Sequence, residues 1–307
     1  MHAIPEAFAR SIVEVWEDEG AAWLRRLPDR LVEYSRRWDL VVGPPLEPLS
    51  YNYVAPATRR DGAEAVLKVG VPRDEVRTEI AALQIYAGRG AVRLLEADAD
   101  SCAMLLERLR PGRMLSTLGD DDRMTEIAAE VVRRLWQPAA PGHVFPQLAD
   151  WFDGFADLRR AFGGATGPLD ARLVAEAEGL SRDLLASTAE PVLLHGDFHH
   201  YNVLSADREP WLAIDPKGRV GDPAYDTSTL FYNALPEGLD DAELGRFLTR
   251  RVEVLAGALG IDRARILGWG VAQAMLSAWW SYDDHGHGYE PTMRVAAALS
   301  LVRAVRG

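Results

Sequence analysis

The stretch from residue 195 to residue 226, HGDFHHYNVLSADREPWLAIDPKGRVGDPAYD, constrains the fold of this chain more than any other. An apolar run at 191–194 precedes it and predicts a short buried strand. The segment Asn202-Val203-Leu204 runs out to the turn-forming residues 207–210, and the apolar run 211–214 runs back. This pattern predicts a β-hairpin, which brings its two ends back to the same place.

The open end of that hairpin collects residues suited to metal and substrate binding. Asn202 and Asp215 are predicted to face each other there, and Asp197 lies in the loop that enters the hairpin. Carboxylate and amide oxygens are the hard ligands that Mg²⁺ prefers. One acid is then left to hold a hydroxyl group and accept its proton, so the arrangement predicts phosphoryl transfer.

The first third of the chain predicts an antiparallel sheet with one inserted helix. Apolar residues at helical spacing over 6–39 predict helices, with Pro28 at a break or in the first turn of a second helix. An Asp61-Gly62 turn is expected to join two strands as a hairpin. The elements predicted after these helices are strands at 40–42, 51–55 and 63–69, a helix at 73–87, and strands at 92–96 and 102–107.

Helices dominate the remainder of the chain. They are predicted at 121–136, 145–162, 169–187, 241–259, 264–282 and 291–305. Strands followed by helices favour the α+β class with two lobes. Because Arg110-Pro111-Gly112 is a natural linker, we expect a first lobe at 1–109, with 1–37 as a helical extension, and a mainly helical second lobe at 110–307.

The composition limits the classes of partner that the protein can bind and the cellular compartment in which it is expected. A net charge of −12 argues against nucleic-acid binding, which needs a basic surface, and suits a cationic small substrate. The single cysteine, Cys102, permits no disulfide framework, and the N-terminus has no signal-peptide pattern, so a cytoplasmic protein is expected. The apolar segment Ile266–Tyr282 is predicted to be a buried helix and not a membrane span. We expect a monomer that binds no membrane.

The motif HGDFHHYN at 195–202, followed by Ile214-Asp215-Pro216, resembles the signature of the aminoglycoside phosphotransferase family. Three further segments, RLL at 93–95, MLLE at 104–107 and REPWLAIDP at 208–216, are similar to the streptomycin 6-phosphotransferases and hydroxyurea-resistance kinases of that family. The resemblance covers most of the chain after about residue 40. It implies a two-lobed, protein-kinase-like fold whose first lobe binds the nucleotide.

The residues of the hairpin suggest distinct roles. Asp197 would hold and orient the attacking hydroxyl, while Asn202 and Asp215 would bind Mg²⁺. The resemblance implies that His195 is a structural residue of the catalytic loop. Histidines at 195, 199 and 200 also invite a metal-hydrolase interpretation, although adjacent histidines are poorly placed to converge and no HExxH motif is present.

Lys68 lies in an otherwise apolar predicted strand and therefore needs an anionic partner. Glu75 or Glu79 on the following helix could supply it, and Glu79 matches the family better. This pattern resembles the kinase lysine that contacts the α- and β-phosphates. The alternative is an edge lysine that points to water.

Other nucleotide contacts are expected by resemblance. No glycine-rich GxGxxG loop is present, so Ser50 and Asn52 would donate hydrogen bonds to the phosphates instead. Backbone groups of Glu107 and Leu109 would contact the adenine edge; the alternative is a simple strand end. ATP is the expected nucleotide, and GTP is the alternative.

The interval from Asp215 to Asp226 is too short for a phosphorylatable activation loop. This argues against a regulated protein kinase and favours a small-molecule enzyme. Asp222 and Asp226 are expected to be structural, either bonding loop amides or capping the helix near Thr227.

The acceptor site is expected after the apolar helix that carries Trp279. Asp283, Asp284 and Glu290 would bind cationic groups of an antibiotic, because paired carboxylates suit guanidinium groups. The alternative is an ordinary solvated acidic turn. The resemblance thus implies transfer of the γ-phosphate of Mg-ATP to a hydroxyl of an aminoglycoside-type antibiotic, streptomycin first, giving resistance. Hydroxyurea or a metabolic alcohol as acceptor, or a nucleotide-binding pseudokinase, are the alternatives.

Overall fold

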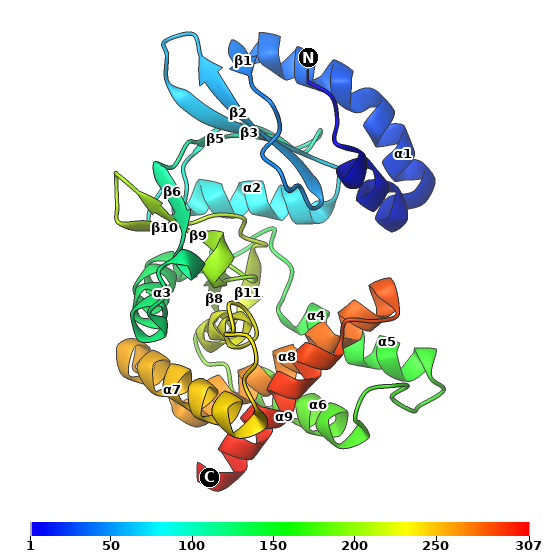
Figure 1. The fold of residues 1–307 in the computed structure, drawn as a ribbon, viewed down its shortest axis with the longest axis vertical. Helices are drawn as coiled ribbons and strands as arrows, with labels where there is room; N and C mark the ends of the chain where they lie inside the picture. Colours follow the sequence, from blue (N-terminus) through cyan, green and yellow to red (C-terminus); the bar gives the residue numbers. More distant parts are fainter. Residues whose placement is uncertain (1, 307) are drawn as a thin grey trace. The chain divides into compact units, whose positions relative to one another are not determined.

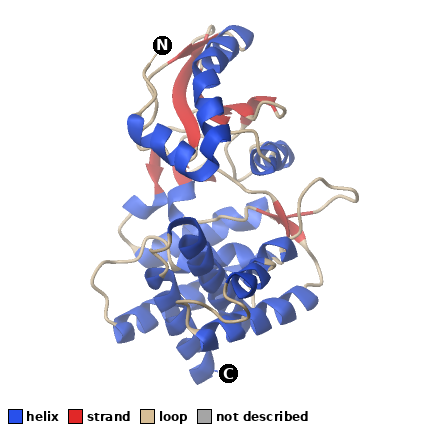
Figure 2. Cartoon of the chain, turned by 90° about the vertical axis from the view of Figure 1, so that its right-hand side faces the viewer, coloured by secondary structure: helices blue, strands red, loops and turns tan. Residues whose placement is uncertain are grey.

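The computed structural model describes residues 2–306, which form two compact units that divide between Gly112 and Arg113. Strands concentrate in the first unit, whereas helices make up most of the second (Figure 2). The protein therefore belongs to the α+β class, as the sequence predicts.

The first unit is built on a five-stranded antiparallel sheet with the strand order β1-β2-β3-β5-β4. The predicted Asp61-Gly62 turn joins β2 to β3, and Gly62 has the positive φ of 85° that such a turn requires. The helix α2, Asp74–Tyr86, is the one helix inserted between the strands, as expected (Figure 1). The strands are β1 Leu40–Val42, β2 Asn52–Arg59, β3 Glu64–Gly70, β4 Leu94–Asp98 and β5 Ala103–Glu107.

The N-terminal helix α1, Glu6–Arg37, packs on this sheet and is sharply bent (Figure 1). The expected position of the break was wrong: the bend is at Glu17, with φ 46° and ψ −126°, and Pro28 lies inside the helix. The first segment folds back so closely that a Cβ on Gly20 would lie 2.4 Å from the Ile12 carbonyl oxygen. Burial of Leu27 beside Pro28 offsets the hydrogen bond that proline cannot donate.

The second unit surrounds two small sheets with helices. Its sheets have the strand orders β10-β9-β6 and β11-β8-β7. The strands are β6 Pro111–Met114, β7 Gln137–Pro138, β8 Val192–Leu194, β9 Val203–Ala206, β10 Trp211–Ala213 and β11 Arg219–Gly221. The helices are η1 Leu115–Thr117, α3 Asp121–Leu135, α4 Ala149–Phe152, α5 Gly154–Ala161, α6 Ala171–Ala186, η2 His200–Asn202, η3 Pro223–Phe231, α7 Asp241–Leu259, α8 Arg263–His285 and α9 Glu290–Arg306.

The helix expected at 145–162 differs from prediction in both its start and its continuity. The chain becomes helical only at Ala149, and α4 and α5 are separate helices that meet at Asp153. The segment before Ala149 runs beside β11 instead, where the Leu148 N–H donates to the Val220 carbonyl and the Val220 N–H donates to that of Pro146. These tertiary hydrogen bonds replace the first helical turns that periodicity alone predicts.

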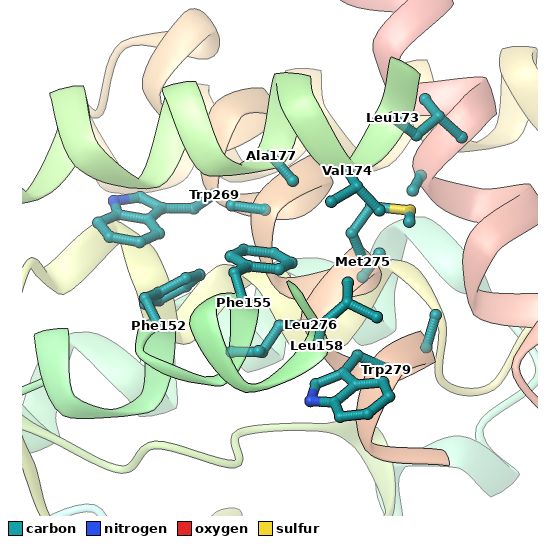
Figure 3. Close-up of a cluster of buried hydrophobic side chains, with 14 of the residues drawn as sticks. Phe152, Phe155, Leu158, Leu173, Val174, Ala177, Trp269, Met275, Leu276 and Trp279 are labelled. Carbon is teal, nitrogen blue, oxygen red and sulfur yellow. The ribbon is translucent and has the colours of Figure 1, made fainter. Parts of the chain in front are cut away.

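The hydrophobic core of the second unit is centred on α8. Aromatic and aliphatic side chains from α4, α5 and α6 interlock around Trp269, Met275 and Leu276 (Figure 3). Gly270 lets Phe231 and Leu299 approach closely, since a Cβ there would lie 3.0 Å from each. The prediction of a buried helix at 266–282 is confirmed. Among residues 2–306, no helix has the length and apolar character needed to span a membrane.

Candidate active site

The predicted hairpin is present and carries the polar residues to its open end. β9 and β10 pair with Leu204 opposite Leu212, and the Ile214 N–H donates to the Asn202 carbonyl at 2.9 Å. Asn202 and Asp215 thus lie at the mouth of the hairpin, as the sequence predicts. The loop that enters it starts where the buried strand β8 ends, at Leu194.

Asp226 holds the start of that loop. Its buried carboxylate accepts the N–H groups of His195 at 3.0 Å and Gly196 at 2.8 Å, and the Trp136 Nε1–H at 3.1 Å. Burial raises the pKa of Asp226 to about 6, against the opposing effect of these donors. The expected structural role, bonding loop amides, is confirmed. Asp222 is structural too: it caps η3 through the Ala224 N–H.

His195 fixes the conformation of the loop residues that follow it. Its ring is fully buried, Nδ1 accepts the Asp197 N–H at 3.3 Å, and Nε2 therefore carries the proton that is donated to the Ile214 carbonyl at 2.9 Å. Burial lowers the pKa of His195 to about 4, so the ring is neutral at neutral pH. Because both ring nitrogens are used within the fold, His195 acts as a structural link between the loop and the hairpin.

The Asp197 carboxylate points to a partly open position, with 36% of the side chain exposed. His199 Nε2 lies 3.6 Å from Asp197 Oδ1. Burial tends to raise the pKa of Asp197, but the interactions with His199 and the positive charge of Lys217 outweigh it, so the pKa lies below its usual value. An ionised carboxylate in this place can accept a hydrogen bond from a hydroxyl group and orient it.

Asn202 is oriented by the same loop. Its Nδ2 donates to the Asp197 carbonyl at 3.0 Å and lies 3.3 Å from His199 Nε2. With the amide nitrogen engaged in this way, the amide oxygen is the atom suited to a cation. Asp215 has a positive φ of 64°, a conformation that aspartate tolerates better than most residues. One carboxylate and one amide oxygen form a donor set that fits Mg²⁺, which uses few protein ligands beside phosphates and water.

The three histidines do not form a metal cluster. His195 uses both ring nitrogens, and His200 is fully buried with both ring nitrogens unpartnered among the described residues. Across the part of the chain that the structure describes, no three His, Cys, Asp or Glu side chains are placed to share one metal ion. The geometry therefore gives the metal-hydrolase interpretation no support.

In the first unit, Lys68 pairs with Glu79. The ammonium group lies 2.7 Å from both carboxylate oxygens, and the two side chains are only 6% and 7% exposed. β3 lies between β2 and β5, so the alternative of an edge lysine pointing to water is wrong. Glu75, the other candidate partner, is exposed on α2.

The other residues expected to contact a nucleotide also lie in the first unit. Ser50 precedes β2, and Asn52, at its start, is opposite Gly70 in the register of β3. A Cβ on Gly70 would lie 2.5 Å from Asn52 Oδ1, so glycine makes room for that side chain. The Glu107 N–H donates to the Arg93 carbonyl at 3.0 Å, so an adenine contact at Glu107 would fall to its carbonyl oxygen. Leu109 follows as a buried residue.

The expected acceptor residues separate into two environments. Trp279 is 3% exposed and packs in the core against Phe162 and Tyr282, so its role is packing (Figure 3). Asp283 and Asp284 are exposed in the last turn of α8, which extends beyond its predicted end to His285. Glu290 is exposed at the start of α9.

Two residues near the motif carboxylates have no role in the predicted phosphotransferase site, and His199 enters the sequence analysis only through the metal-hydrolase alternative. His199 contacts both Asp197 and Asn202, and the Lys217 ammonium lies 3.6 Å from Asp215 Oδ2. Both residues are close to the motif residues in sequence, which could have marked them as candidate site residues. Only the fold shows where their side chains point.

Comparison with known proteins agrees with this geometry. A family model described as aminoglycoside/hydroxyurea antibiotic resistance kinase matches residues 41–285. The chain belongs to this family. Membership in this kinase family makes the protein a phosphotransferase, and confirms the resemblance seen in the motifs.

Relatives of this kinase family align over nearly the whole chain. A streptomycin 6-kinase of Streptomyces glaucescens is 35% identical over 99% of this chain and 97% of its own length. A hydroxyurea phosphotransferase of Kitasatospora aureofaciens is 36% identical over 92% of this chain and 81% of its own. The solved structure of a thermostable mutant aminoglycoside phosphotransferase, in complex with ADP and hygromycin B, superposes with a TM-score of 0.61 at 13% identity, covering 90% of this chain and 98% of its own. That likeness confirms the expected fold.

Replacing Asp226 with asparagine is expected to lower the free energy of unfolding by about 1–3 kcal/mol, because an amide cannot accept all three N–H donors and leaves a buried donor unsatisfied. Urea unfolding of the variant measures this. Asp207→Asn, in the exposed turn of the hairpin, is the matched control and should leave stability unchanged. Equal stability of the two variants would contradict the assigned role of Asp226.

Proposed function

We propose that this protein transfers the γ-phosphate of Mg-ATP to a hydroxyl group of a cationic antibiotic, with streptomycin as the leading acceptor. The observation that carries the proposal is the placement of Asp197 beside Asn202 and the hairpin mouth, in a chain of the antibiotic resistance kinase family. The relative named streptomycin 6-kinase, 35% identical over 99% of the chain, supports the acceptor and phosphorylation of its 6-hydroxyl. Such a reaction would confer resistance.

In the second unit, Asp197 holds the acceptor hydroxyl and accepts its proton late in the reaction. Its lowered pKa makes it a weak base, so the main contribution is orientation of the attacking oxygen. Asn202 and Asp215 hold Mg²⁺, which when bound neutralises charge on the phosphates. His195 and Asp226 keep this loop in place through the bonds described above.

In the first unit, Lys68 binds the nucleotide phosphates and Glu79 holds its ammonium group in position. Ser50 and Asn52 donate to the phosphates, while the Glu107 carbonyl and the Leu109 N–H contact the adenine edge. The proposed domain roles follow: the first lobe binds nucleotide, and the second carries the catalytic loop and the acceptor site.

The acidic end of α8 supports a cationic acceptor. Burial, together with Asp284 and Asp157, raises the pKa of Asp283. Carboxylates at a helix C-terminus are also disfavoured by the helix dipole. A guanidinium group bound by Asp283 and Asp284, with Glu290 nearby in sequence, would relieve this repulsion.

Phosphorus NMR of the products formed from Mg-ATP and streptomycin tests the proposal. A new phosphomonoester resonance coupled to a ring proton of the antibiotic is expected, with ADP released in equal amount. The same assay with hydroxyurea tests the second candidate, which the 36% identical hydroxyurea phosphotransferase favours. If ADP is released with hydroxyurea but not with streptomycin, hydroxyurea is the acceptor. If phosphate is transferred to no acceptor, the proposed function is wrong.

A further inference from the structure

Lysine is rare in this chain compared with arginine. Of its 34 Lys and Arg residues, only Lys68 and Lys217 are lysines. Lys68 is the buried partner of Glu79, where a compact ammonium group sits 2.7 Å from two carboxylate oxygens. Lysine is a compact point charge, whereas arginine is a wide planar fork. The one other lysine therefore marks a second place where this chain has a compact cation.

Lys217 is fixed at the active-site loop by its own backbone. Its N–H donates to the His195 carbonyl at 2.7 Å, and a Cβ on Gly196 would lie 3.1 Å from Lys217 Cβ. Gly196 also has a positive φ of 86°, so glycine is required there on both counts. The base of the lysine side chain is thus clamped against the residue that immediately precedes Asp197.

The ammonium group of Lys217 lies at the mouth of the hairpin. It lies 3.6 Å from Asp215 Oδ2, its charge helps to lower the pKa of Asp197, and its side chain is 25% exposed. It therefore interacts with the proposed metal ligand and with the residue that holds the hydroxyl. A quarter of its surface is accessible to a ligand.

The loop between Asp197 and Asn202 contains no lysine or arginine. The nearby Arg219 is committed elsewhere, with its guanidinium 4.3 Å from the centre of the Trp151 ring. Phosphoryl transfer, however, needs positive charge close to the equatorial oxygens of the transferred phosphoryl group.

We propose that Lys217 is a catalytic residue whose ammonium group contacts the transferred phosphoryl group. The inference rests on the proposed function. In the step, the acceptor oxygen forms a bond to the γ-phosphorus, the bond to the β,γ-bridging oxygen breaks, and its electron pair stays with ADP. The hydroxyl proton passes to Asp197, while Lys217 stabilises the negative charge on the three oxygens of the moving group.

Two variants of Lys217 and a matched control test this assignment. Lys217→Met removes the charge but keeps the length of the side chain, and is expected to lower kcat by about 10²–10³-fold with little change in KM. Lys217→Arg keeps the charge and should restore part of kcat. Arg123→Met, which removes an exposed cation paired with Glu126 on α3, should leave kcat unchanged.

Binding without turnover separates a phosphoryl contact from support of Asp215. Mg-ADP should bind Lys217→Met and the wild-type protein equally in calorimetry, whereas Asp215→Ala should bind it weakly. Aluminium fluoride mimics the transferred phosphoryl group in the transition state. It should tighten ADP binding to the wild-type protein and should not tighten it to Lys217→Met. Midpoints of thermal unfolding verify that each variant is folded.

Three results would overturn the role of Lys217: wild-type kcat in Lys217→Met, undiminished tightening by aluminium fluoride in that variant, or a loss of Mg-ADP binding equal to that of Asp215→Ala. The last would make Lys217 a support for Asp215. These outcomes are distinct from failure of the proposed function, in which the wild-type protein itself binds no Mg-ADP or transfers phosphate to no acceptor.

Discussion

Replacing Asp197 with asparagine is expected to lower kcat by about 10²–10⁴-fold while Mg-ADP binding survives. The carboxylate is ionised, partly exposed and oriented beside His199 and Asn202, so its loss removes the group that holds the attacking hydroxyl. Steady-state kinetics with the acceptor and calorimetry with Mg-ADP measure the two quantities separately. An asparagine can still pack in the same space, so the fold should be retained.

The control for this experiment is Asp207→Asn, which makes the same chemical change in the exposed turn of the same hairpin. It should turn over at the wild-type rate. If Asp197→Asn also retains wild-type kcat, Asp197 is not the residue that positions the hydroxyl. If it loses Mg-ADP binding as well, its role lies in the metal site and not in hydroxyl orientation.

The second large effect is expected on stability. Glu79→Leu should lower the free energy of unfolding by about 3–5 kcal/mol, because it removes the carboxylate that lies against the buried ammonium group of Lys68. Urea unfolding measures the loss. Adding Lys68→Met to this variant should recover most of it, since two apolar side chains can fill the space of a buried ion pair without an unpaired charge.

Glu75→Leu is the matched control, one helical turn away on the exposed surface of α2. It should change stability far less than Glu79→Leu. The interpretation fails if the two single variants are equally stable, or if Lys68→Met makes Glu79→Leu less stable still. The double variant should bind Mg-ADP weakly even though it is folded, because the proposed phosphate-binding cation is gone.

Local sequence patterns were sufficient to predict those elements that form between residues close together in the chain. The hairpin of β9 and β10 follows from two short apolar runs around a turn, and its mouth holds Asn202 and Asp215 as expected. The inserted helix α2 and the Asp61-Gly62 turn were equally predictable. In each case a short segment satisfies its own hydrogen bonds, so periodicity and turn residues carry the information.

Predictions failed where packing contacts in the folded chain outweigh local sequence preferences. The bend of α1 lies at Glu17 and not at Pro28, because the contact between Ile12 and Gly20 and the burial of Leu27 outweigh the preference of proline. The segment before Ala149 bonds to β11 instead of forming the first turns of a helix. The partner strand β11 comes from far along the chain, so this bonding is not visible in the local sequence.

By itself, then, the sequence determined the α+β class, the hairpin with its polar mouth, and membership of a kinase family, because these rest on short-range patterns and motifs. Only the tertiary structure decided that Glu79 is the buried partner of Lys68, since Glu75 and Glu79 lie on one face of α2 and only packing buries one of them. It also placed Trp279 in the core and the ammonium group of Lys217 beside Asp215. The physical reason is the same throughout: the burial and the direction of a side chain depend on what packs against it in the folded chain.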